Sequence, residues 1–115
     1  MCLELYSDTK KLIAEEDIEC YKILYKEDGI FRTFYRDFPI EAGKTYESII
    51  SKEGYRIQMG LHSYVDKENA ICSNLYTAKC IIPKGSEYYL GSFCGKDSYA
   101  SNVLKYVEIT EVGEA

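Results

Sequence analysis

Alternation of hydrophobic and polar residues dominates the chain and predicts β-strands, most clearly over residues 55–65. Successive side chains of a strand point to opposite faces. One face of this segment would carry Tyr55, Ile57, Met59, Leu61 and Val65. The opposite face would carry Arg56, Gln58, His62 and Tyr64. Gly60 interrupts the polar row, which indicates a β-bulge or a close approach to the backbone. We expect the first face to be buried and the second to be available to a ligand.

Further strands are predicted on both sides of this segment. Over residues 18–25, aromatic and aliphatic side chains alternate with Cys20, Lys22 and Leu24, so both faces should be partly covered. Asp28-Gly29 is typical of a tight hairpin turn, after which residues 30–35 would return as the second arm. The remaining strands are predicted over residues 45–50, 76–82, 87–91 and 103–110.

A short helix is predicted over residues 67–75. Asp66 is a suitable N-cap, and Ile71, Cys72 and Leu75 would form an apolar stripe that packs on the sheet. With about six or seven short strands and this helix, the pattern predicts an α+β fold with an antiparallel or mixed sheet. No linker or repeat divides the chain, so we expect a single domain over residues 1–115.

Composition and charge narrow the function classes. The 115 residues are 46% hydrophobic, include 12 tyrosines and carry a net charge of −5. An acidic chain lacks the basic surface that duplex nucleic acid requires. No apolar run is long enough to span a bilayer, and the first residues lack the regions of a signal peptide. We therefore expect a cytoplasmic protein that binds neither duplex nucleic acid nor membrane, and that self-associates to form a homo-oligomer.

Motifs for catalysis and metal binding are missing from the sequence. The five cysteines are scattered without a C-x-x-C pair, which favours buried thiols over disulfides or a metal site. His62 is the only histidine, and there is no nucleophile elbow, Walker loop or dinucleotide-binding glycine motif. The sequence therefore predicts no catalytic residues, no metal and no cofactor.

His62 is the centre of the candidate site. It could be a general base, a ligand-binding group or a histidine hydrogen-bonded within the sheet, and the last interpretation is the most common for such a residue. Arg56 and Tyr64 would share its face and, with it, suit an anionic or heterocyclic ligand. We expect four more residues to reach the site from turns. The predicted ligand-binding residues are Arg56, His62, Tyr64, Lys84, Tyr88, Ser98 and Tyr99.

A second polar face is predicted on the arm over residues 30–35. Arg32, Phe34 and Arg36 would project together, and guanidinium groups flanking an aromatic ring can bind a carboxylate or phosphate. A solvated face with ordinary charge pairs is the more common outcome of such a pattern, and we favour it.

Four segments carry a resemblance to other proteins. They are residues 17–22 (DIECYK), 60–64 (GLHSY), 80–91 (CIIPKGSEYYLG) and 98–101 (SYAS). Over about residues 11–108 the chain resembles small uncharacterised proteins of phages, prophages and gut bacteria. The resemblance implies a viral or mobile-element origin, where accessory proteins such as inhibitors of host defence are common. It implies no particular activity.

Three hypotheses follow for the function. The first is a non-enzymatic phage or prophage accessory protein that sequesters a small anionic, nucleotide-type ligand or blocks a host protein. The second is an enzyme that uses NAD, because the chain distantly resembles the ADP-ribosyltransferase fold. The required ordered set ending in a catalytic glutamate is not assigned in this sequence. The third is a structural or protein-interaction module without a ligand pocket.

Overall fold

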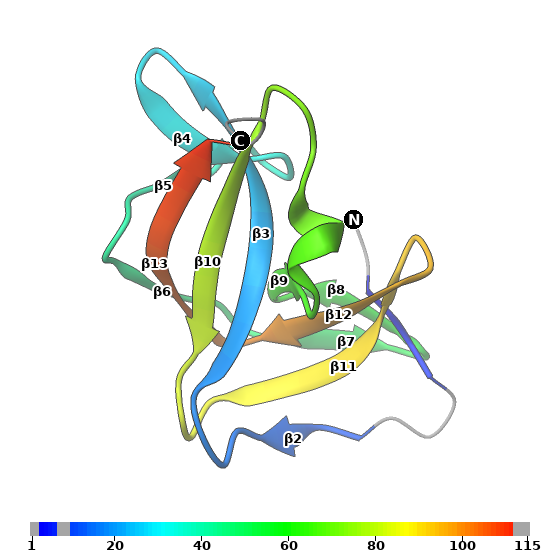
Figure 1. Ribbon diagram of the computed structural model, residues 1–115. Helices are drawn as coiled ribbons and strands as arrows, with labels where there is room; N and C mark the ends of the chain where they lie inside the picture. The colour runs from blue at the N-terminus through cyan, green and yellow to red at the C-terminus, as the bar shows by residue number, and fades with distance from the viewer. Residues whose placement is uncertain (1–2, 7–9, 112–115) are drawn as a thin grey trace.

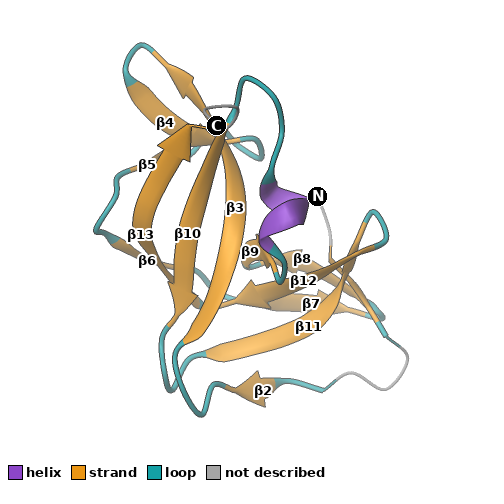
Figure 2. Ribbon diagram, in the orientation of Figure 1, coloured by secondary structure: helices purple, strands orange, loops and turns teal. Residues whose placement is uncertain are grey.

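The structure, a computed structural model, describes residues 3–6 and 10–111. Within these residues the chain is almost entirely β-structure, and thirteen strands form one sheet (Figures 1 and 2). The first strands are β1 (Leu3–Leu5), β2 (Leu12–Ile13), β3 (Ile18–Glu27), β4 (Ile30–Thr33), β5 (Pro39–Ile40), β6 (Thr45–Glu47) and β7 (Ser51–Glu53). The others are β8 (Arg56–Met59), β9 (Leu61–Tyr64), β10 (Tyr76–Ile82), β11 (Glu87–Phe93), β12 (Lys96–Ser101) and β13 (Val103–Glu111).

The sheet is antiparallel and strongly curled. Its main path is β6-β13-β10-β3-β9-β12-β11-β1-β8-β7, with β2 paired to β11 and the β4–β5 arm paired to β3. Figure 1 shows β13, β10 and β3 running crosswise to β11 and β12. Within the described chain, β3 and β9 pair only at Tyr21 and Tyr64. The two halves of the sheet therefore diverge beside this single pair.

Two apolar clusters stabilise the curl. The larger lies inside the β3–β10–β13 half and includes Leu24, Ile82 and Leu104, which are fully buried. The smaller joins β1, β8 and β11 through Leu3 and Ile57, which are also fully buried. Each cluster consists of inward-facing residues of neighbouring strands, as the period of two requires.

The predicted α+β fold class is wrong. The segment expected to be a helix over residues 67–75 forms only a 3₁₀ turn, η1 (Lys67–Ala70), and the chain is extended again at Ile71 (Figure 2). The Asp66 side chain makes no capping hydrogen bond, and Ile71 is 50% exposed. Without a cap and a buried stripe, so short a helix has no source of stability.

Some of the strand predictions are confirmed, and others are corrected by the structure. The hairpin at Asp28-Gly29 is confirmed: both residues have positive φ, and β3 pairs with β4. The segment over residues 55–65 is two strands, because the backbone breaks at Gly60, where φ is +151°. Its apolar face is not uniformly buried: Ile57 is fully buried, whereas Tyr55 is 64% exposed.

Candidate functional site

A cavity of about 630 Å³ opens where β3 and β9 diverge. Its lining comes mainly from β3, the segment from the end of β4 to β5, the end of β6, and the β8–β9 segment. Single residues of β11, β12 and β13 and Leu75, which precedes β10, complete it. Most of the lining is apolar. Its aromatic members are Phe34, Tyr35, Phe38, Tyr46, Tyr64, Phe93 and Tyr106.

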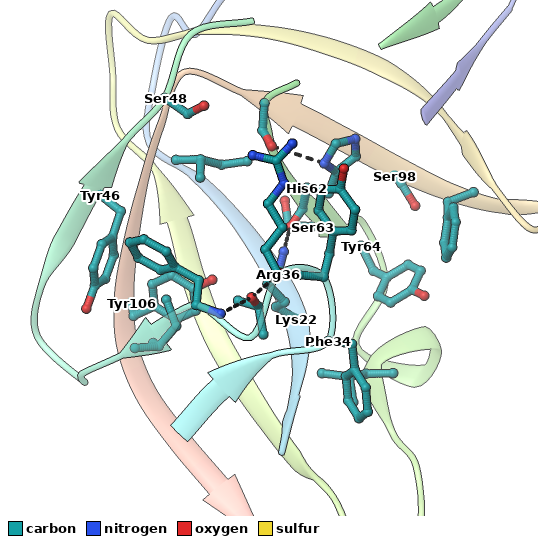
Figure 3. A pocket seen from close by; sticks show the side chains of 18 of the residues that line it. Lys22, Phe34, Arg36, Tyr46, Ser48, His62, Ser63, Tyr64, Ser98 and Tyr106 are labelled. Atoms are coloured by element: carbon teal, nitrogen blue, oxygen red, sulfur yellow. Dashed lines mark hydrogen bonds between the residues drawn. The ribbon is translucent and has the colours of Figure 1, made fainter. Parts of the chain in front are cut away.

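Lys22 supplies the cation of the cavity interior. It lies on β3 between Cys20 and Leu24, both fully buried, so its side chain shares the core-facing side of the strand. The ammonium Nζ donates a hydrogen bond to the backbone carbonyl of His62, at 2.7 Å (Figure 3). No carboxylate in the described chain forms an ion pair with it. Desolvation lowers the pKa of Lys22, because burial removes part of the hydration of the ammonium.

His62 contributes an uncharged imidazole to the lining of the same cavity. Its Nδ1 lies 3.1 Å from the carbonyl oxygen of Gly60, which requires the proton on Nδ1 and leaves Nε2 as an acceptor. Nε2 is buried and has no hydrogen-bond partner among residues 3–6 and 10–111. Burial, assisted by the charge of Lys22, lowers the pKa of His62 to about 4. The imidazole is therefore uncharged at neutral pH.

The outer part of the cavity carries exposed aromatic residues and a second cation. Phe34 and Phe38 are 50% and 51% exposed, and Tyr35 lies beside them in the β4–β5 loop. Arg36, in the same loop, has a φ of +67° and places its guanidinium 5.1 Å from the Tyr35 ring centre. Figure 3 shows Arg36, Lys22 and His62 around one space, with Tyr46 and Tyr106 on one side and Tyr64 on the other.

The structure brings together three of the seven predicted site residues. His62, Tyr64 and Ser98 line the cavity. Tyr64 packs against Phe93, with ring centres 6.4 Å apart, and burial raises its pKa. Ser98 is 2% exposed, and its hydroxyl donates to the Lys96 carbonyl, so this group already has a partner.

The other four predicted residues lie away from the cavity. Arg56 forms a 3.7 Å ion pair with Glu4, and both side chains are 65% exposed. Lys84 is an exposed turn residue. Tyr88 and Tyr99 pack edge to face, with ring centres 5.7 Å apart, against the larger core cluster. Their rings therefore pack with the core and do not line the cavity.

Sequence reasoning missed Lys22 as a site residue. The available signal was a lysine between Cys20 and Leu24 on one face of a predicted strand.

The face over Arg32, Phe34 and Arg36 was predicted to be solvated, and the structure gives its three residues different surroundings. Phe34 and Arg36 line the cavity, whereas Arg32 donates to the Asp37 carbonyl at 2.8 Å.

The described cysteines are divided between the core and the surface. Cys20 and Cys80 are fully buried and lie opposite each other on β3 and β10, whereas Cys72 and Cys94 are exposed; Cys2 lies outside the described residues. Burial raises the pKa of Cys20 to about 11 and that of Cys80 further. Both buried groups are therefore protonated, which makes them poor nucleophiles.

Comparison with known proteins yields no match: no protein-family model, curated protein or solved structure is significantly similar to the chain. In the part of the chain that the structure describes, no helix combines the length and the apolar character that crossing a bilayer demands.

Proposed function

We propose that the protein is a non-enzymatic binding protein for a small anionic ligand with a flat, apolar body. The observation that carries this proposal is Lys22, a cation directed into an apolar cavity without a carboxylate partner in the described chain. Burying a charge costs free energy unless an opposite charge or hydrogen bonds compensate it. A bound anion would supply the missing partner.

The cavity supports a ligand of this kind in its size and lining. Its volume of about 630 Å³ falls within the range typical of small-molecule sites. The aromatic side chains offer surfaces for stacking a ring system, and Arg36 adds a planar cation at the outer part. Nucleotides, which combine a ring with phosphate, and aromatic carboxylates both meet this description and form the test panel.

The proposal retains the biological setting that the resemblance implies. A phage or prophage accessory protein that sequesters a small molecule would need a pocket that binds the ligand stoichiometrically, and it would need no catalytic group. The buried, protonated thiols and the neutral, covered imidazole of His62 support binding over nucleophilic chemistry.

The test is a calorimetric titration of the protein with nucleoside monophosphates, cyclic nucleotides, ADP-ribose, NAD and aromatic carboxylates. Two variants accompany the wild type: K22M, which removes the interior cation, and K79M, which removes a partly exposed lysine of the same sheet. We expect saturable binding that K22M weakens at least tenfold and K79M preserves.

Denaturation of the complex followed by mass analysis completes the test. We expect the intact ligand and the unmodified protein. Cleaved NAD or a covalent adduct would favour the transferase alternative. Absence of binding throughout the panel, or binding that K22M does not affect, would contradict the proposal.

A further inference from the structure

The charged groups around the cavity are few. Lys22 and Arg36 are cationic and Glu47 is anionic, and His62 is neutral for the reasons given above. Two positive charges and one negative charge leave a formal charge of +1 among the described lining residues. A ligand with one negative charge would neutralise this set, whereas a dianion would leave an excess negative charge in the cavity.

The cations also lie at different depths. Lys22 projects from the core-facing side of β3, whereas Arg36 belongs to the exposed β4–β5 loop with Phe34. An anion that contacts Lys22 must therefore be at the end of the ligand that enters first. The flat part then remains between the aromatic side chains of the outer cavity. In a phosphodiester flanked by two bulky groups, the charge lies in the middle of the molecule. Such a ligand cannot place its anion at the inner end and its flat part outside.

The lining also lacks the groups that usually bind phosphate. Phosphate sites in proteins use a helix N-terminus, a glycine-rich loop or several arginines. Among the described lining residues there is one arginine, one glycine and no residue of η1. A carboxylate needs fewer donors, and the protons of Lys22 Nζ that do not bond to His62 can satisfy it.

We propose that the ligand is a flat, largely apolar monocarboxylate that binds with its carboxylate against Lys22 and its ring system between the aromatic residues of the outer cavity. This inference rests on the proposed function and narrows the ligand from any small anion to one chemical class. It also fixes the orientation of the ligand, with the charge inward and the ring outward.

Three probes with one ring system test the inference: 2-naphthoate, 2-naphthamide and 2-naphthyl phosphate, each titrated by calorimetry at pH 8. We expect 2-naphthoate to bind most tightly. The neutral amide should bind about tenfold to hundredfold more weakly, the range for losing a charge-assisted hydrogen bond. The phosphate, a dianion at this pH, should also bind more weakly than the carboxylate. Its affinity should rise as the pH falls below about 6, where it becomes a monoanion.

Variants separate failure of this inference from failure of the proposed function. In K22M and in K22Q, the carboxylate and the amide should bind with equal affinity, and circular dichroism establishes that each variant is folded. Naphthyl phosphate binding as tightly as naphthoate at pH 8, in a Lys22-dependent manner, would overturn the monocarboxylate inference and leave the anion-binding function standing. Binding of none of the probes or of the nucleotide panel, or the same carboxylate preference in the folded Lys22 variants, would overturn both.

Discussion

Replacing Lys22 by methionine should stabilise the unliganded protein. Methionine has a similar length and shape but no charge, so the variant removes the desolvated ammonium and keeps the packing beside Cys20 and Leu24. Exchanging a buried ion pair for apolar side chains is often neutral or stabilising, by about 1–4 kcal/mol, and an ammonium without a carboxylate partner has less to compensate its desolvation. The lost hydrogen bond leaves the His62 carbonyl without its 2.7 Å donor, which costs about 1–3 kcal/mol.

The upper ends of these two ranges differ by about 1 kcal/mol, and we expect a gain of this size because a cation is more costly to desolvate than a carbonyl. For a domain of 115 residues this corresponds to a rise in Tm of about 4 °C. Urea unfolding and a thermal scan at pH 7 measure it. The control is K79M, whose lysine forms a 3.2 Å pair with Glu19 at the surface and should change stability by less than about 0.5 kcal/mol.

The gain in K22M should also depend on pH. The folded pKa of Lys22 lies below its ordinary value of 10.5, so between these two values the unfolded wild type binds more protons than the folded wild type. Wild-type stability therefore rises with pH in this window, and the advantage of K22M shrinks toward pH 10.5. A loss of more than about 2 kcal/mol in K22M would refute the reasoning. Lys22 would then be a structural link between β3 and β9.

Two further predictions test the geometry around the site and the sheet. The pKa of His62 falls from 6.5 in the unfolded chain to about 4 in the folded one, so the unfolded state takes up a proton first as the pH falls. Stability should decrease between pH 6.5 and pH 4 by as much as about 3 kcal/mol. The H62Q variant should show a flatter urea-unfolding profile over the same range, and equal slopes would argue against a buried imidazole. Gly91 on β11 faces β1 so closely that an added Cβ would lie 2.3 Å from the Glu4 carbonyl oxygen. G91A should therefore lose about 3 kcal/mol or more, while S92A on the adjacent position stays within about 1 kcal/mol. A G91A protein as stable as the wild type would show that β1 does not lie against β11.

Local patterns along the chain predicted several of the strands, but no strand was predicted over residues 51–53 or 96–101, which form β7 and β12. The alternation over residues 18–25 and the Asp28-Gly29 turn gave β3 and the start of β4, because both signals depend on near neighbours. The predicted helix after Asp66 failed for a related reason. Its start signal was present, but a short helix is stable only when tertiary packing covers its stripe, and Ile71 remains half exposed.

The candidate site was harder to predict because it depends on where two strands diverge. The alternation placed Arg56 and His62 on one face, but Gly60 separates β8 from β9, and the two side chains have different surroundings. Lys22 entered the site because β3 and β9 pair at a single position, a long-range feature that no local pattern records. His62, Tyr64 and Ser98 share the cavity because β9 and β12 are neighbouring strands. Ser98 lies on β12 and not on a turn, so its predicted route into the site is wrong.

The most direct test of the account is the ionisation of Lys22 with and without a ligand. Lysine labelled with ¹³C at Cε can be titrated by NMR, and the Lys22 signal is assigned by its loss in K22M. A bound carboxylate beside the ammonium should raise the midpoint of this titration, because an opposite charge favours the charged form. We predict that 2-naphthoate shifts the midpoint of Lys22 upward and leaves Lys79 unchanged. Saturable binding of the ligand without a change at Lys22 would contradict the account.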